Sequence, residues 1–169
     1  EVTTPVFTST VAQNSWHHRL GATLNAADLA VVSYNSDGDD TFALIALANI
    51  PGSSVIHITD DGYKTGSGFD HNEGTSTWTV AAGGLSAGTI IRFTNAGATA
   101  ALVDPAHGSI TGALSLSAQG DQLFIYQTDD DISSGTIERL DGSGGTEAGI
   151  LYGFNADLSH SPVNGWHSG

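Results

Sequence analysis

The sequence predicts an all-β fold, an antiparallel β-sandwich of about eight strands with Ig-like or jelly-roll-like topology. Short apolar runs rich in Val, Ile, Thr, Phe and Tyr recur along the chain, and Gly, Pro, Asn or Asp separate them. The chain has 169 residues, of which 39% are apolar, so it is long enough for one domain with a core. The expected strands are 28–34, 41–48, 54–59, 76–81, 89–94, 113–117, 122–127 and 149–154.

Two of these segments define how the strands are expected to face. "VIHIT" alternates, with Ile56 and Ile58 on one face and His57 on the other. "TFALIALANI" is apolar on both faces, as expected of a strand buried on both sides, although its Ala and Leu residues would also allow a short helix. If the strands 28–34, 41–48 and 54–59 are neighbours, consecutive loops alternate between the two ends of the sheet. The 35–40 loop and Asp60 then lie at the same end, separated by one strand, and a joint site is allowed.

We expect one domain over residues 1–169, with irregular ends. Residues 1–27 form an N-terminal arm or strand, and 128–148 an acidic hairpin or loop. The C-terminal "SHSPVNGWHSG" consists of loop-forming residues. A closing strand is therefore expected to be missing, cleaved off or supplied by a neighbour, and an open edge of that kind pairs readily with another chain.

The charge of the chain excludes two classes of partner. Asp and Glu number 18 against 4 Lys and Arg, which gives a net charge of −14. Nucleic acid and anionic membranes require a basic surface, and no stretch approaches the length of a membrane span. Cysteine is absent, so disulfides, zinc–thiolate sites and thiol nucleophiles are excluded. Few Lys, low pI and abundant Gly, Thr and Ser indicate a secreted bacterial protein, with Glu1 either as the mature end left after signal-peptide removal or as the edge of a piece of a longer chain.

The acidic loops are the candidate metal site. In "YNSDGDD", Asn35, Asp37 and Asp39 alternate as in an EF-hand, but Asp40 replaces the required glycine and Ala46 occupies the last ligand position. An irregular cage remains open, because Ca²⁺ accepts 6–8 oxygens. The candidate ligands are Asn35, Asp37, Asp39, Asp40, Asp60 and Glu73. The alternative is a solvated turn, since Asn, Asp and Gly favour turns.

Aromatic residues and histidines give weaker signals. Trp16, Tyr63, Trp78 and Trp166 are candidates for stacking on a sugar, although buried or rim aromatics are the commoner explanation. His57 and His71 flank the acidic stretch and could contribute to a transition-metal site. No GxSxG or Walker motif is present. We predict a protein that is not an enzyme.

Four stretches resemble a known module. They are "DLAVVSYNSDGDDTFALIALANIPGSSVIHITDDGYKTG", "NEGTSTWTV", "ALSLSAQGDQLFIYQ" and "ILYGFNAD". Together they are similar to the lamin-tail-like, "GYNSDGxDxFAFV…FTDNGW" module of secreted bacterial proteins, with departures at Asp61 and Tyr63, where the pattern has Asn and Trp. The resemblance implies an extracellular β-sandwich accessory or surface module and carries no reaction.

Three function hypotheses follow. The first is a non-catalytic extracellular module, calcium-stabilised, for surface adhesion or carbohydrate binding, with a glycan or surface protein as partner. The second is a structural subunit of an extracellular filament or surface layer that self-associates by strand donation. The third is a hydrolase that uses paired carboxylates such as Asp60 and Glu73.

Overall fold

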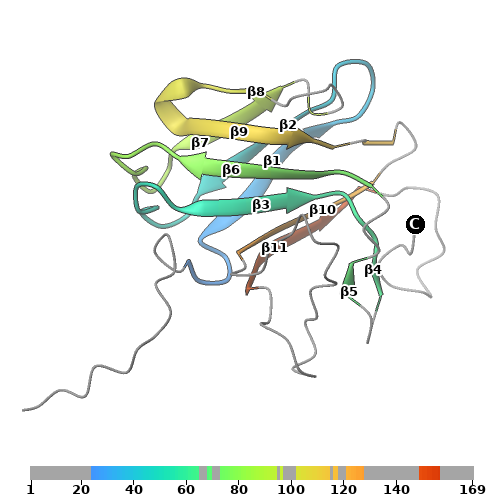
Figure 1. Cartoon of the computed structure of the whole chain (residues 1–169), viewed down its shortest axis with the longest axis horizontal. Coiled ribbons are helices and arrows are strands. Elements are labelled where there is room, and N and C mark those ends of the chain that lie inside the picture. The colour runs from blue at the N-terminus through green and yellow to red at the C-terminus, as the bar shows by residue number, and fades with distance from the viewer. Residues whose placement is uncertain are drawn as a thin grey trace, which may run out of the picture.

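The chain folds as two antiparallel sheets packed face to face in a computed structural model, which describes residues 24–64, 68–69, 73–94, 96, 102–114, 116–117, 121–127 and 149–156 (Figure 1). The predicted β-sandwich is confirmed. The four-stranded sheet has the order β1 (Leu29–Asn35), β2 (Thr41–Ala46), β7 (Ile90–Thr94), β8 (Leu102–Val103). The five-stranded sheet has the order β11 (Gly149–Asn155), β10 (Gln122–Gln127), β3 (Val55–Thr59), β6 (Thr75–Val80), β9 (Gly108–Ala113).

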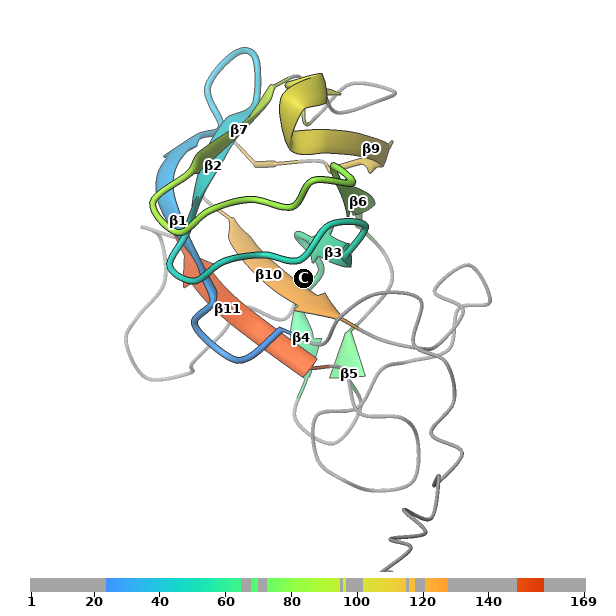
Figure 2. The same cartoon turned by 90° about the vertical axis from the view of Figure 1, so that its left-hand side faces the viewer.

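Two smaller elements complete the described chain. The strands β4 (Tyr63–Lys64) and β5 (Gly68–Phe69) form a separate hairpin, and the 3₁₀ turn η1 (Pro105–His107) leads into β9. Viewed from the side, the two sheets are separate layers, with β1 beside β11 (Figure 2). No helix within the described residues has the length and hydrophobicity needed to cross a membrane.

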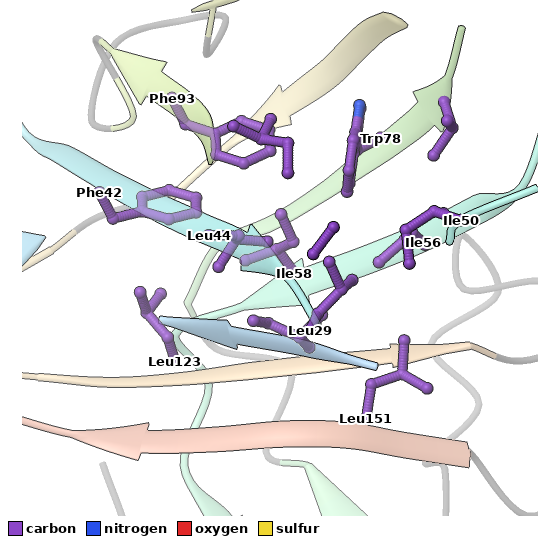
Figure 3. Close-up of a cluster of buried hydrophobic side chains, with 14 of the residues drawn as sticks. Leu29, Phe42, Leu44, Ile50, Ile56, Ile58, Trp78, Phe93, Leu123 and Leu151 are labelled. Atoms are coloured by element: carbon purple, nitrogen blue, oxygen red, sulfur yellow. The ribbon is translucent and has the colours of Figure 1, made fainter. Parts of the chain in front are cut away.

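Strict alternation explains how β6 joins the core. Its sequence TSTWTV places Ser76, Trp78 and Val80 in the buried positions and the three threonines in partly exposed ones. Trp78 meets Phe93 edge-on from the opposite sheet, with ring centroids 5.4 Å apart, and Phe93 stacks on Phe42 at 4.7 Å (Figure 3). Aliphatic side chains of both sheets fill the space around these rings, so most of the hydrophobic stabilisation lies between the sheets.

Two expectations about the strands are wrong, and a third holds only in part. The strand expected at 113–117 lies at Gly108–Ala113 instead, because a run of Gly, Ser and Thr hides its alternation. Strand β3 belongs to the opposite sheet from β1 and β2, so the three are not neighbours. Strand β2 is buried on both sides only in part: Phe42 and Leu44 are buried on the inner side and Ala43 on the outer side, whereas Ile45 is half-buried and the following Leu47 is exposed.

Candidate functional site

All described Asp and Glu side chains belong to the connections, and none belongs to a strand. The strand register shows which connections share an end. In the four-stranded sheet, Asn35 pairs with Thr41, and in the five-stranded sheet Thr75 pairs with both Thr59 and Ala113. The Ala96 amide donates to the carbonyl of Asp40 at 3.0 Å and the Leu114 amide to the carbonyl of Ala96 at 2.7 Å. These bonds join the same end of both sheets.

This end, which we name the acidic end, holds most of the described carboxylates. They are Asp37, Asp39, Asp40, Asp60, Asp61, Glu73 and Asp121. The opposite end of the described sandwich carries Asp28 and Asp104. The predicted ligands Asn35, Asp37, Asp39, Asp40, Asp60 and Glu73 therefore all lie at one end, and Asp121 joins them from the start of β10.

Tyr34 lies among carboxylates from both sheets. Burial raises the pKa of its phenol from 10.0 to about 12; the nearby Ser36 hydroxyl opposes this rise, and the charges of Asp121, Asp40 and Asp60 add to it. These three carboxylates are therefore near enough to act on one hydroxyl. That oxygen is buried and has no hydrogen bond of normal geometry. The site is a region of negative potential with a neutral phenol at its centre.

Asp60 and Asp61 hold the backbone of this end in place. Both side chains are buried. Asp60 accepts a hydrogen bond from the Gly74 amide at 2.7 Å, and Asp61 accepts one from the Glu73 amide at 2.8 Å. The Thr59 hydroxyl also donates to Asp61 at 3.2 Å. Each carboxylate thus ties the end of β3 to the start of β6, which is a structural use of a buried charge.

The loop between β1 and β2 is an Asx-type turn, which the side chain of Asn35 closes by hydrogen bonds to the backbone. The Asp37 amide donates to Asn35 Oδ1 at 3.3 Å, and Asn35 Nδ2 donates back to the Asp37 carbonyl at 3.2 Å. Asp37 and Asp39 are exposed. Asp40 is partly buried; burial raises its pKa, the backbone amide of Leu116 opposes that rise, and the charge of Asp39 adds to it. The loop therefore offers solvated carboxylates beside one that is partly desolvated.

The described carboxylates do not make up a closed metal cage. Across the described ranges, no three His, Cys, Asp or Glu side chains come together as a metal would require. His57 lies apart from the acids: it is buried, its Nδ1 is 3.1 Å from the Thr77 hydroxyl, and its ring is 5.3 Å from that of Tyr126. Burial lowers the pKa of His57. The position of His71 lies outside the described residues.

The four predicted sugar-stacking aromatics have different outcomes. Trp78 is wrong as a ligand-binding residue: it is 0% exposed, and its indole Nε1 donates to the His107 carbonyl at 3.1 Å. Alternation with outward threonines was the sequence signal for this burial. For Tyr63 the structure describes the backbone in β4, and Trp16 and Trp166 lie outside the described residues.

Sequence reasoning missed Tyr34 and Asp121. Tyr34 reads as one more aromatic of a strand, and Asp121 as a single acid in a turn. The available signal was positional, because both residues stand at strand termini that antiparallel pairing brings to the same end. Comparisons with protein-family models, with curated proteins and with solved structures found no match.

Proposed function

We propose that this chain is a non-catalytic extracellular β-sandwich module that engages calcium and a glycan or surface protein at its acidic end. One observation carries the proposal: loops from both sheets bring their carboxylates to a single end, around Tyr34. In sandwich proteins the loops at one end of a rigid scaffold are the usual place for binding. The strands below supply the rigidity.

A non-catalytic role is supported by how the buried acids are used. Asp60 and Asp61 each accept a backbone amide bond and fasten β3 to β6. A general acid or base needs a proton to exchange with substrate, whereas these side chains hold loops. We therefore favour binding over the hydrolase alternative.

Calcium would bind this end as an open, partly hydrated site. Because the described acids do not form a group of three suited to a metal, water and backbone carbonyls would complete the 6–8 oxygens. The approach of a divalent cation would offset the mutual repulsion that helps to raise the pKa values of Tyr34 and Asp40.

Thermal unfolding in EDTA and in calcium tests the metal part. At ten times the dissociation constant, a bound ion stabilises the native state by about 1.4 kcal/mol, which raises Tm by roughly 3–5 °C for a chain of this size. Asp40→Asn should reduce this rise by more than half. Asp104→Asn is the matched control: Asp104 also accepts one backbone amide, from Ala106 at 2.8 Å, but lies at the opposite end.

Two results would contradict the proposal. A Tm that is the same in EDTA and in saturating calcium would remove the metal. An equal loss of the calcium effect in Asp40→Asn and Asp104→Asn would remove the acidic end as its site. Binding to a glycan array, with and without calcium, tests the carbohydrate part, and an array without hits would favour a protein partner.

A further inference from the structure

The dipeptide Asp-Gly occurs twice within the described residues, at Asp37–Gly38 and at Asp61–Gly62. Both pairs lie at the acidic end, but their surroundings differ. Asp37 and Gly38 are exposed in the loop between β1 and β2, whereas Asp61 and Gly62 are buried behind the end of β3. The same dipeptide is therefore found in two opposite environments at one end of the molecule.

An Asp-Gly sequence can rearrange without an enzyme, because glycine has no side chain to keep its nitrogen away from the aspartate. The glycine nitrogen loses its proton and attacks Cγ of the aspartic acid side chain. A C–N bond forms, a Cγ–O bond breaks and that oxygen leaves as water, which gives a five-membered succinimide. Water then opens the ring. Opening at Cγ restores aspartate, and opening at the main-chain carbonyl gives isoaspartate, so one water is lost, one is regained and nothing is oxidised.

The loop at Asp37 leaves both reacting groups accessible. A Cβ added at Gly38 would meet no atom within 4 Å, and no hydrogen bond within the described part of the chain holds the Gly38 amide. Asn35 Nδ2 donates to the Asp37 carbonyl at 3.2 Å. A donor at this oxygen stabilises the anion of the same peptide group, so it favours loss of the Gly38 proton that the attack requires.

Asp61 is held in the opposite way. It is 1% exposed, and its carboxylate accepts hydrogen bonds from the Glu73 amide at 2.8 Å and from the Thr59 hydroxyl at 3.2 Å. Turning Cγ toward the Gly62 nitrogen would break these bonds inside the protein, where an unpaired polar group is costly. The fold should therefore slow the reaction at Asp61 at least about tenfold, which corresponds to about 1.4 kcal/mol of activation free energy.

We infer that Asp37 is a site of spontaneous isoaspartate formation and that the fold protects Asp61 from the same reaction. The product adds Cβ of residue 37 to the main chain of the β1–β2 loop. It also converts the Asp37 carbonyl, which accepts the Asn35 side chain, into a free carboxylate. Asn35 is the last residue of β1 and pairs with Thr41, so the change falls where the hairpin closes.

Incubation of the whole chain for weeks at neutral pH, without urea and in urea above the unfolding midpoint, tests the inference. EDTA in both samples makes the result independent of calcium binding. Digestion with endoproteinase Asp-N, which does not cleave before isoaspartate, and electron-transfer fragmentation report each position separately, including Asp141–Gly142, which lies outside the described residues. In the folded protein, isoaspartate should form at Asp37 at least about tenfold faster than at Asp61. In urea the two rates should be similar.

Two alanine variants form a matched pair. Gly38→Ala keeps the carboxylate but places a methyl group beside the attacking nitrogen, so it should slow the reaction at Asp37 at least about tenfold. Gly88→Ala is the control, because Gly88 has the same φ of +87° and the same open space, and it should leave that rate unchanged.

Three results would overturn the inference. The first is equal rates at Asp37 and Asp61 in the folded protein, and the second is no isoaspartate at Asp37. The third is a difference between the two positions that persists in urea, because the flanking sequence rather than the fold would then set the rates.

Discussion

Replacing Tyr34 with phenylalanine should stabilise the protein. The hydroxyl is buried without a hydrogen bond of normal geometry, and leaving such a group unpaired costs about 1–3 kcal/mol. The ring itself would remain in contact with Phe154, whose centroid is 5.4 Å away. Because Tyr34 as a whole is only half-buried, we use the lower end of this range, about 1 kcal/mol, as the cost of the unpaired hydroxyl. We expect Tyr34→Phe to raise the free energy of unfolding by about 1 kcal/mol at pH 7.

The same substitution should change the response to alkali. The pKa of Tyr34 is raised from 10.0 to about 12 in the folded protein, so the neutral phenol is favoured by folding. This contribution is complete below pH 10 and is lost as pH rises from 10 to 12. At full burial it would amount to about 2.7 kcal/mol, and screening at a half-exposed side chain reduces it to about 1 kcal/mol. Tyr34→Phe lacks this loss.

Urea unfolding at pH 8 and pH 11, followed by circular dichroism, measures both effects. The advantage of Tyr34→Phe over the wild type should grow from about 1 to about 1.5 kcal/mol between the two pH values, because pH 11 lies midway between 10 and 12 and about half of the contribution is lost there. Tyr152→Phe is the control, because the Tyr152 hydroxyl is not among the buried oxygens without a partner, and its effect should stay within about 0.5 kcal/mol. A loss of 1 kcal/mol or more in Tyr34→Phe at pH 7 would refute the reasoning, since it would mean that the hydroxyl has a strong partner.

Three further predictions concern the core and the backbone. His57 has a lowered pKa because it is buried, so its contribution to stability is present above pH 6.5 and is lost on acidification; His57→Gln should flatten the fall in urea midpoint between pH 7.5 and 5. Trp78→Phe should cost about 2–3 kcal/mol, because it opens a cavity and removes the indole bond to a backbone carbonyl, and equal stability in a thermal melt would contradict this. Gly108→Ala should cost several kcal/mol of stability, since the new Cβ would lie 2.0 Å from the Thr79 carbonyl oxygen. Gly38→Ala is the control and should cost about 1 kcal/mol, because Gly38 has φ +87° but open space around it. Similar losses of stability for both variants would show that the close contact at Gly108 is relieved.

Strands rich in large apolar residues were predictable, and glycine-rich or two-residue ones were not. The strand expected at 122–127 was found at Gln122–Gln127, and the one expected at 54–59 at Val55–Thr59. In Val55–Thr59 the signal is alternation of apolar residues, and in Gln122–Gln127 it is a continuous run of large apolar residues; Asp follows or precedes each segment. In contrast, Gly108–Ala113 contains two glycines with positive φ and one large apolar residue. Its pairing with β6 is a tertiary effect that the local sequence does not encode.

The candidate site was predictable in its residues but not in its geometry. Alternation of loop ends predicted that Asp40 and Asp60 lie at the same end, and they do. They were expected to meet as loops of one sheet, but β3 belongs to the five-stranded sheet, so the two residues approach each other from opposite sheets. The structural use of Asp60 could not be foreseen, since its partner, the Gly74 amide, lies 14 residues away. Side-chain to backbone bonds of this range depend on the complete fold.

The most direct test of the proposed function is a calcium titration followed by ¹H–¹⁵N correlation spectra. Amide shifts should concentrate at the acidic end, in Asn35, Asp40, Asp60 and Gly74, with the turn at Gly52 and Gly84 at the opposite end unchanged. Magnesium, which dehydrates reluctantly and demands stricter geometry, should give weaker shifts. Spectra that do not change at saturating calcium, or shifts centred on the opposite end, would contradict the proposal.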